Sequence, residues 1–280
     1  MAAIAYALSA SLVYGLSDFL GGLKSRTCSL LGVLLVSQGA AFALLAAFVL
    51  LRGEGPPSGE FLLWAAAAGV AEAVGVAALY RGLAVGMMSV VAPVASTAPV
   101  VPIVAGISLG ELPGALQWAG IALAVAGILI AGSASPGGGS TPETVRAGLI
   151  FGLLSAVGFG AFYVALDAAS EGDIPWALVV ARATAVALFV GAYAASRARP
   201  RIPRSEVPVL ILIGVLIIAA DSLYAVSSTK GLLGVVAVLS TLYPVVTIAL
   251  ARIFLGERLE RAQQVGIVAV LGGVFAISAA

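Results

Sequence analysis

The sequence predicts an all-α integral membrane protein with ten transmembrane helices, arranged as two inverted five-helix repeats around a central cavity. Three observations support this fold class. Hydrophobic residues make up 61% of the 280 positions and charged residues 10%, whereas a soluble chain carries about 25% charged residues. Long apolar segments separated by short polar breaks fill the chain, and residues of the first half recur in order in the second. A chain with so little charge needs the lipid bilayer as part of its solvent.

Ten segments are long enough to cross a membrane, because a hydrocarbon core about 30 Å thick requires roughly 20 apolar residues of helix. Backbone groups in lipid must be paired within the segment, so each segment is expected to be a helix. The first segment lacks the basic residues of a signal peptide and is interpreted as a retained span. The expected spans are residues 3–23, 30–51, 61–80, 87–108, 114–132, 147–166, 175–195, 207–229, 232–254 and 262–279.

Lysine and arginine fall almost entirely in the odd-numbered connections between these spans. Those connections, together with the last turn of the span at 232–254, hold Lys24, Arg26, Arg81, Arg146, Arg197, Arg199, Arg201, Arg204, Arg252, Arg258 and Arg261. The even-numbered connections hold Arg52 and Lys230. Because positive residues favour the cytoplasmic side, the odd connections are predicted to be cytoplasmic and both termini to lie on the outer side.

Two lone carboxylates, Glu72 and Asp221, occupy matching places in the two halves. Each is followed at the same spacing by a basic residue, a glycine and a leucine, and the two runs are offset by 149 residues. Leu-Gly-Glu at 109–111 likewise recurs at 255–257, and its glycines are expected to end helices in the left-handed C-cap conformation. The chain therefore divides into a first repeat (1–132), a linker rich in Gly, Ser and Pro (133–146) and a second repeat (147–280). Because five is odd, the second repeat is inverted, which places the expected substrate site between the repeats near the membrane midplane.

Composition excludes several classes of function. Histidine is absent and Cys28 is the only cysteine, which excludes histidine-based metal sites, Cys-x-x-Cys metal sites and Ser-His-Asp triads. We therefore expect no metal, no cofactor and no enzyme activity. A net charge of +1, without a basic run interleaved with aromatic residues, gives no indication of nucleic-acid binding.

Glu72 and Asp221 are the main candidates for substrate binding, because ionisable groups at membrane depth usually face the bundle interior or a wet cavity. A structural, hydrogen-bonded role is the alternative. The spacing of Asp221, Tyr224 and Ser228 predicts one polar stripe on a helix. Glycines flank Glu72, so we expect Glu72 to be the more buried acid and Asp221 the more direct substrate contact.

Further candidates for the substrate site lie in the other spans. Arg182, in the middle of its span, is expected to pair with a carboxylate or to bind a substrate carboxylate, and the sequence names no partner for it. The first span carries Ser11, Tyr14 and Asp18 on one stripe. For the aromatic candidates, packing between helices is the alternative. The remaining candidates are Tyr14, Tyr80, Tyr163, Ser96, Ser240 and Tyr243.

Prolines and two basic residues are candidates for gating. Pro93, Pro99 and Pro244 lie inside expected spans, where proline frees backbone carbonyls that can bind a substrate ammonium or allow bending. A kinked helix satisfied by Ser and Thr hydroxyls is the alternative. Arg81 and Lys230 follow the two acids by nine residues; they are expected either to act as gates or to extend to the interface as ordinary basic side chains.

The duplicated five-helix unit resembles the EamA-type branch of the drug/metabolite transporter superfamily along essentially the whole chain. The residues that carry the resemblance are Tyr14-Gly15, Phe159-Gly160, Tyr243-Pro244 and Leu255-Gly256-Glu257. The first repeat departs from the pattern, since Gln38 stands where the second repeat has Arg182. The resemblance implies ten helices and export of amino acids, other metabolites or drugs, with bacterial amino-acid exporters of the YddG type as the most similar members.

The function predicted from these features is export of amino acids or related small metabolites by alternating access. Its partners are a small-molecule substrate and the bilayer. A proton is the candidate coupling ion, because removal of water penalises the charged form of a carboxylate such as Glu72 or Asp221; uncoupled export is the alternative. Export of a different class of drug or metabolite, conduction through a passive channel and catalysis by a membrane-embedded enzyme also remain open at this point. We expect a monomer, with a dimer as the alternative, in the bacterial inner membrane.

Overall fold

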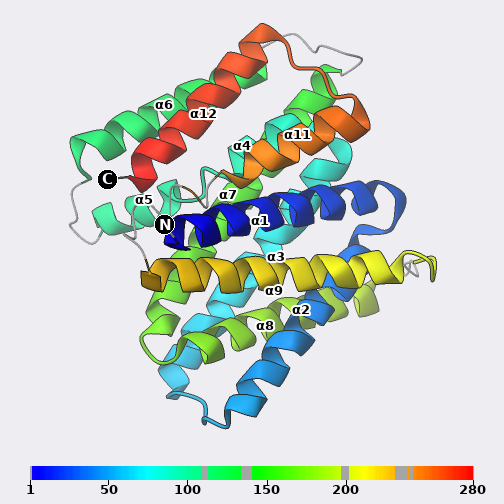
Figure 1. Cartoon of the computed structure of the whole chain (residues 1–280), viewed down its shortest axis with the longest axis vertical. Helices are drawn as coiled ribbons and strands as arrows, with labels where there is room; N and C mark the ends of the chain where they lie inside the picture. The colour runs from blue at the N-terminus through cyan, green and yellow to red at the C-terminus, as the bar shows by residue number, and fades with distance from the viewer. Residues whose placement is uncertain are drawn as a thin grey trace.

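The computed structural model describes residues 2–108, 113–133, 141–196, 202–230, 239 and 242–279. Within these residues every regular element is an α-helix, as the sequence predicts (Figure 1). The helices are α1 (Ala2–Thr27), α2 (Leu30–Arg52), α3 (Gly59–Val85), α4 (Met88–Ala95), α5 (Val100–Ser108), α6 (Ala115–Ser133), α7 (Pro142–Ser170), α8 (Ile174–Ala195), α9 (Val207–Lys230), α11 (Tyr243–Leu255) and α12 (Arg261–Ser278).

Among the described residues, eight helical segments are long and apolar enough to cross a membrane, and two shorter apolar helices cover 115–131 and 243–255. The predicted span at 87–108 is broken in the middle into α4 and α5, with turns at 96–99. Most of the first half of the predicted span at 232–254 lies outside the described residues, and α11 forms its second half. An all-helical membrane fold is therefore confirmed.

Helix α7 begins at Pro142, inside the segment that the sequence assigns to the linker. The reason is a capping box: the Thr141 side chain accepts from the N–H of Thr144, and the Thr144 hydroxyl accepts from the N–H of Thr141. These two bonds satisfy N–H groups that the first turn of a helix leaves unpaired. Residues 134–140 of the predicted linker lie outside the described residues.

The contacts between the two repeats come in matched sets. Helix α3 packs against α7 and α8, and its counterpart α9 packs against α1 and α2. Two further pairs, α2 with α8 and α6 with α12, each join a helix to its own counterpart. The largest apolar core lies among α1, α2, α3, α4, α8, α9 and α11, so both repeats contribute to it. Exchanging the halves therefore reproduces the packing, which is the arrangement expected for two repeats related by a pseudo-two-fold axis.

Helices α6 and α12 give the most direct evidence of this symmetry (Figure 1). Gly120 faces Gly273 and Gly127 faces Gly266: a Cβ at either α6 position would lie 2.8 or 2.6 Å from the facing carbonyl oxygen. The sequence pairs Gly120 with Gly266 and Gly127 with Gly273 as repeat equivalents. Each glycine thus contacts the equivalent of the other, as in a self-complementary two-fold interface. Only glycine allows the two backbones to approach this closely.

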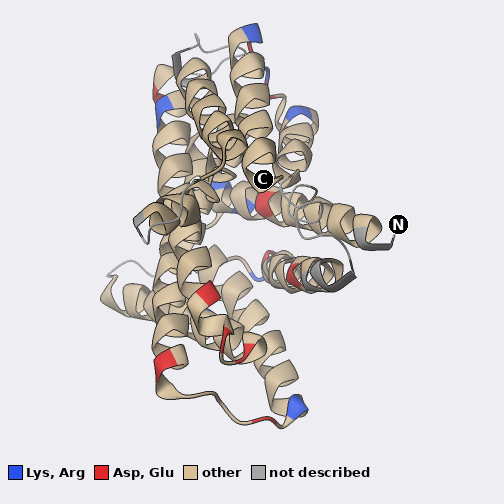
Figure 2. Cartoon of the chain, turned by 90° about the vertical axis from the view of Figure 1, so that its left-hand side faces the viewer, with Lys and Arg blue, Asp and Glu red and all other residues tan. Residues whose placement is uncertain are grey.

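Both ends of the chain lie at the same side of the bundle, on the left in Figure 1, whereas the α1–α2 and α11–α12 connections lie on the right. Lys24 and Arg26 lie in the last turn of α1, next to the first of these connections, and Arg258 lies in the second, whereas Arg52 ends α2 at the far end of that helix from the α1–α2 connection. Seen from the left-hand side, the ribbon is mostly uncharged, with acidic and basic residues dispersed over it (Figure 2). The grouping of basic residues at one end therefore agrees with the sequence. Which side of the membrane that end faces stays a prediction.

Candidate functional site

Arg182 connects the two acids that the sequence singled out. Its Nη1 atom lies 2.5 Å from Glu72 Oε1, and its Nη2 atom lies 3.3 Å from Asp221 Oδ2. Arg182 belongs to α8, whereas the acids belong to α3 and α9, and each residue lies near the middle of its helix. The expectation that Arg182 pairs with a carboxylate is confirmed, and it pairs with two.

Two neutral side chains complete this group, which we call the Arg182 network: Arg182, Glu72, Asp221, Gln38 and Tyr14. Arg182 Nη1 donates to Gln38 Oε1 at 2.6 Å, and the Tyr14 hydroxyl donates to Asp221 Oδ1 at 2.5 Å. Gln38 and Arg182 are repeat equivalents, as are Glu72 and Asp221. The network therefore consists largely of two equivalent pairs that meet between the repeats.

The two acids differ in their exposure. The Glu72 side chain is 7% exposed and the Asp221 side chain 29%. Glu72 is therefore the more buried acid, as the flanking glycines predicted: Gly69 packs on the backbone of α8 and Gly75 on Phe159 of α7. Asp221 keeps an accessible edge even though Tyr14 and Arg182 bind it.

The Arg182 network carries one excess negative charge when both acids are ionised, since one guanidinium faces two carboxylates. Arg182 Nε is also buried without a hydrogen-bond partner in the described part of the chain. A buried donor left unpaired costs about 1–3 kcal/mol. In this conformation the Arg182 network therefore keeps one carboxylate charge without a counter-ion and one N–H group without an acceptor.

Four of the tyrosines proposed from sequence lie within electrostatic range of Asp221 or of Asp18, a third acid inside the bundle. Tyr80 is buried at 1% exposure, Tyr163 is exposed at 47%, and Tyr14 and Tyr243 are intermediate. Asp221 acts electrostatically on Tyr14 and Tyr163, whereas Asp18 acts on Tyr80, Tyr163 and Tyr243. Tyr224 packs against Ala7 of α1. Their participation in substrate binding stays a prediction.

The proline-containing fourth span has its polar groups paired internally. The hydroxyls of Ser96 and Thr97 donate to the carbonyls of Pro93 and Val94 at 2.7 Å each. Pro99 ends the turn between α4 and α5. The two hydroxyl bonds are those expected if the prolines only kink the helix and the Ser and Thr hydroxyls pair the carbonyls that proline frees. Ser240, and the side chains of Ser228 and Lys230, lie outside the described residues.

Pro244 and Arg81 are the remaining described gating candidates. Pro244 is buried in the first turn of α11, where a proline is compatible with the helix because that N–H has no helical partner. Arg81 is exposed near the end of α3, and no hydrogen bond or ion pair involves it among the described residues. Gating by either residue stays a prediction.

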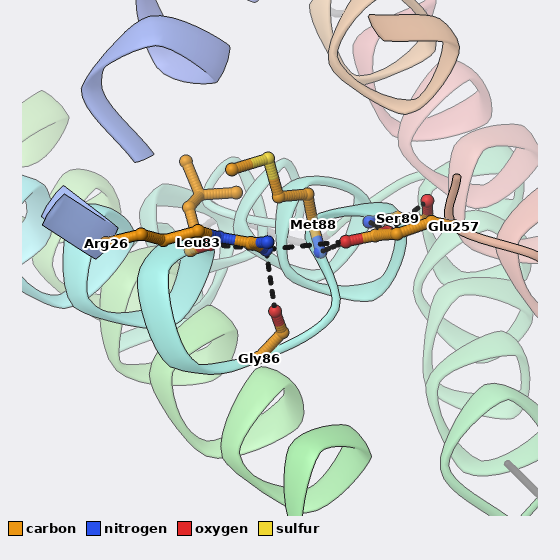
Figure 3. Close-up of polar contacts among 6 residues, drawn as sticks. All are labelled: Arg26, Leu83, Gly86, Met88, Ser89 and Glu257. Carbon is orange, nitrogen blue, oxygen red and sulfur yellow. Dashed lines mark hydrogen bonds and ion pairs between the residues drawn. The ribbon is translucent and has the colours of Figure 1, made fainter. Parts of the chain in front are cut away.

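A second network joins the two repeats near the end of the bundle that carries the α1–α2 connection (Figure 3). Glu257 Oε1 accepts from the N–H of Met88 at 3.0 Å, and Oε2 accepts from the N–H and the hydroxyl of Ser89 at 3.0 and 2.8 Å. Arg26 lies 3.5 Å from Glu257 and donates to the carbonyl of Leu83. We call this the Glu257 network. A carboxylate at a helix N-terminus pairs N–H groups that have no helical partner and faces the positive end of the dipole.

The sequence explains why Glu257 reaches α4. Gly256 adopts a left-handed conformation (φ 65°) and ends α11, as the repeated Leu-Gly-Glu motif predicted. After this turn Glu257 lies beside the N-terminus of α4 in the other repeat. The N-cap residue of α4, Met87, makes no side-chain hydrogen bond to the N–H groups of that helix. The repeat equivalent, Gly110-Glu111, lies outside the described residues. Sequence reasoning recognised the glycine but missed the role of the glutamate, because its partners are backbone groups with no sequence signature.

The comparisons with known proteins agree with this architecture. The EamA-like transporter family matches residues 1–133 and again residues 146–279. No curated protein matches the chain. One solved structure, described as "Crystal structure of protein", is 18% identical with a TM-score of 0.62, covering 98% of this chain and 95% of that one. At this identity the likeness extends to the fold alone.

A membrane-spanning bundle of two matched halves, joined by an ion-pair network in mid-helix, defines a protein of the repeat-built transporter class. The family matches, which together cover nearly the whole chain, identify it further: the chain belongs to the EamA-like transporter family. It is a multi-pass membrane transporter of the drug/metabolite class.

Proposed function

We propose that the protein is a secondary-type transporter that exports amino acids or related small metabolites by alternating access. The observation that carries this proposal is the Arg182 network, in which equivalent residues of two repeats meet near the middle of their helices. Transporters built from repeats bind their substrates at such an interface, near the membrane midplane. Asp221, as the accessible acid, is the contact we assign to the substrate in this network.

Movement of the repeats requires the Glu257 network to open. Glu257 comes from the second repeat and its partners from the first, so rocking one repeat against the other separates the carboxylate from α4. Helix α4 would then lose its cap, so opening costs about 1 kcal/mol of free energy and closing recovers it. A free-energy difference of this size favours the closed arrangement but still allows it to open.

Proton coupling follows from competition for Arg182. Protonation of Glu72 or Asp221 removes the excess negative charge and weakens one ion pair, which frees the guanidinium for a substrate carboxylate. Uncoupled export is the alternative, in which the substrate alone rearranges the network. Replacing Glu72 by Gln and Asp221 by Asn distinguishes the two, because both variants should lose the response to a pH gradient if coupling operates through these acids.

The experiment that tests the function is efflux from proteoliposomes loaded with a panel of amino acids and drugs, with and without a pH gradient. Accumulation outside that depends on the protein supports export. Absence of transport for every amino acid contradicts the amino-acid assignment, and transport of another compound favours a different metabolite class. Ion conductance without saturation indicates a passive channel, and turnover of a lipid-linked compound indicates an enzyme.

Location and orientation are part of the same proposal: the bacterial inner membrane, with both termini outside and the basic end in the cytoplasm. Cys28, the only cysteine, belongs to the α1–α2 connection at that end. A membrane-impermeant maleimide should label Cys28 in permeabilised cells and leave it unlabelled in intact cells. The reverse labelling pattern contradicts the orientation.

A further inference from the structure

Asp18 is a carboxylate inside the bundle that the Arg182 network does not use. It lies on α1, one helical turn from Tyr14, and its exposure is intermediate. No hydrogen bond or ion pair reaches it from any residue that the structure describes, and its oxygens are not among the fully buried atoms that lack partners. An unpaired carboxylate with accessible oxygens is costly at membrane depth and is usually retained for a function.

The face of α1 that carries Asp18 points into the interface between the repeats. Tyr14, Asp18 and Gly21 are spaced by four and three residues, so they lie on one side of the helix. Tyr14 binds Asp221 of α9, and Gly21 lies so close to the Tyr80 ring that a Cβ there would be 2.3 Å from Cζ. Asp18 therefore lies between the contacts of α1 with α9 and with α3.

Tyrosine side chains surround this position. Asp18 acts electrostatically on Tyr80 of α3, Tyr163 of α7 and Tyr243 of α11. Tyr80 is almost completely buried, and its hydroxyl makes no hydrogen bond within the described ranges. Hydroxyl groups inside a protein normally find a partner. The acid and the Tyr80 hydroxyl both lack a partner among the described residues, and neither is among the fully buried atoms without one, which indicates a ligand that bonds to both.

The charge of the surroundings selects the class of ligand. Arg182 is engaged by Glu72 and Asp221, so it leaves Asp18 without a counter-ion. Aromatic rings stabilise cations through their faces, and a carboxylate supplies a charge-assisted hydrogen bond. Resting on the function proposed above, we propose that Asp18, Tyr80 and Tyr243 form a subsite for the ammonium group of the substrate. An amine attached to an apolar or aromatic body would fit this combination of groups.

The test is ligand-induced thermal stabilisation of the full chain in detergent, with phenethylamine as the probe and 2-phenylethanol as a neutral ligand of similar shape. Phenethylamine should stabilise the wild-type protein and 2-phenylethanol should not. Asp18→Asn should weaken binding of the amine at least about tenfold, because a charge-assisted bond is lost. Tyr80→Phe, which removes one hydroxyl, should weaken it by roughly two- to tenfold.

Asp167→Asn is the matched control, because Asp167 is an exposed acid of α7 and the substitution makes the same change of charge. It should bind phenethylamine as the wild type does. The proposal is overturned if the amine fails to stabilise the wild type, if 2-phenylethanol stabilises it equally, or if Asp18→Asn and Tyr80→Phe both bind the amine normally. Binding does not require transport, so amine binding without export contradicts only the proposed function. Export without amine binding contradicts only the subsite.

Discussion

The Arg182 network and the Glu257 network both join the two repeats, but they do so in different surroundings. In the first, Arg182 and Glu72 are 8% and 7% exposed and Asp221 is 29% exposed; in the second, Glu257 is 11% and Arg26 29% exposed. Arg182 meets two carboxylates, whereas Glu257 is held mainly by backbone N–H groups and a hydroxyl. Removing one partner of a buried ion pair is costly, because the other charge stays in the interior without a counter-ion. Losing a helix cap costs only about 1 kcal/mol. The comparison predicts that losing a partner costs more at the centre than at the end of the bundle.

The largest effect is expected from removing the central cation. Arg182→Met leaves two carboxylates facing each other in the interior, and breaking a buried ion pair costs about 3–5 kcal/mol. Thermal unfolding in detergent should show a strongly destabilised protein without transport activity. Adding Glu72→Gln and Asp221→Asn removes the unpaired charges and should restore much of the stability. If Arg182→Met alone is as stable as the wild type, the network does not hold the repeats together.

The next effect separates the two acids. Glu72→Gln weakens a fully buried charge-assisted bond and should destabilise the protein by about 2 kcal/mol. Asp221→Asn, whose side chain is partly exposed, should cost about 1 kcal/mol or less, yet it should reduce substrate affinity more. Unfolding midpoints and the concentration dependence of efflux measure the two effects. Equal losses of stability and affinity in both variants would show that the exposure difference has no functional consequence.

A smaller effect is expected at the Glu257 network. Glu257→Gln keeps an acceptor at α4 but removes the charge that faces Arg26 and the helix dipole, a loss of about 1 kcal/mol. The closed end should then open more often, so the rate at which maleimide modifies Cys28 should rise about fivefold. Glu60→Gln, at the exposed start of α3, is the matched control. An unchanged Cys28 rate in Glu257→Gln would mean that this network does not limit opening.

An effect of similar size, confined to one helix end, is expected at the opposite end, where Asp173 caps α8. Burial opposes its ionisation, but the N–H of Trp176 and the guanidinium of Arg52 outweigh it and hold the pKa of Asp173 below its usual value. The stabilisation is therefore present above the unfolded pKa of about 4 and is lost as pH falls through the lower folded pKa.

Asp173→Ala should cost about 1 kcal/mol at neutral pH and should make the local stability of α8 independent of pH in the acid range. Hydrogen–deuterium exchange at residues 174–178 measures this stability. Protection that decreases with acid in the variant as it does in the wild type would assign the pH dependence to another group.

The sequence by itself determined the class of fold. Low charge and long apolar segments require a membrane, and the repeated motifs indicate two related halves, which the matched packing and the reciprocal glycines of α6 and α12 support. The sequence also identified both acids and Arg182, because an ionisable residue in an apolar helix is unusual in any context. These properties depend on composition and on spacing along one chain.

Only the tertiary structure decided which of these groups meet. Arg182 and Glu72 are 110 positions apart in the sequence, and nothing in either local pattern specifies the other. Five helices from both repeats had to pack before Arg182 could hold both acids and leave Asp18 unpaired. Glu257 shows the same limit, since its partners are mainly backbone groups of a helix in the other repeat. An apolar segment prefers the membrane because of its own residues. The role of a buried charge depends instead on which side chains the packed helices place beside it.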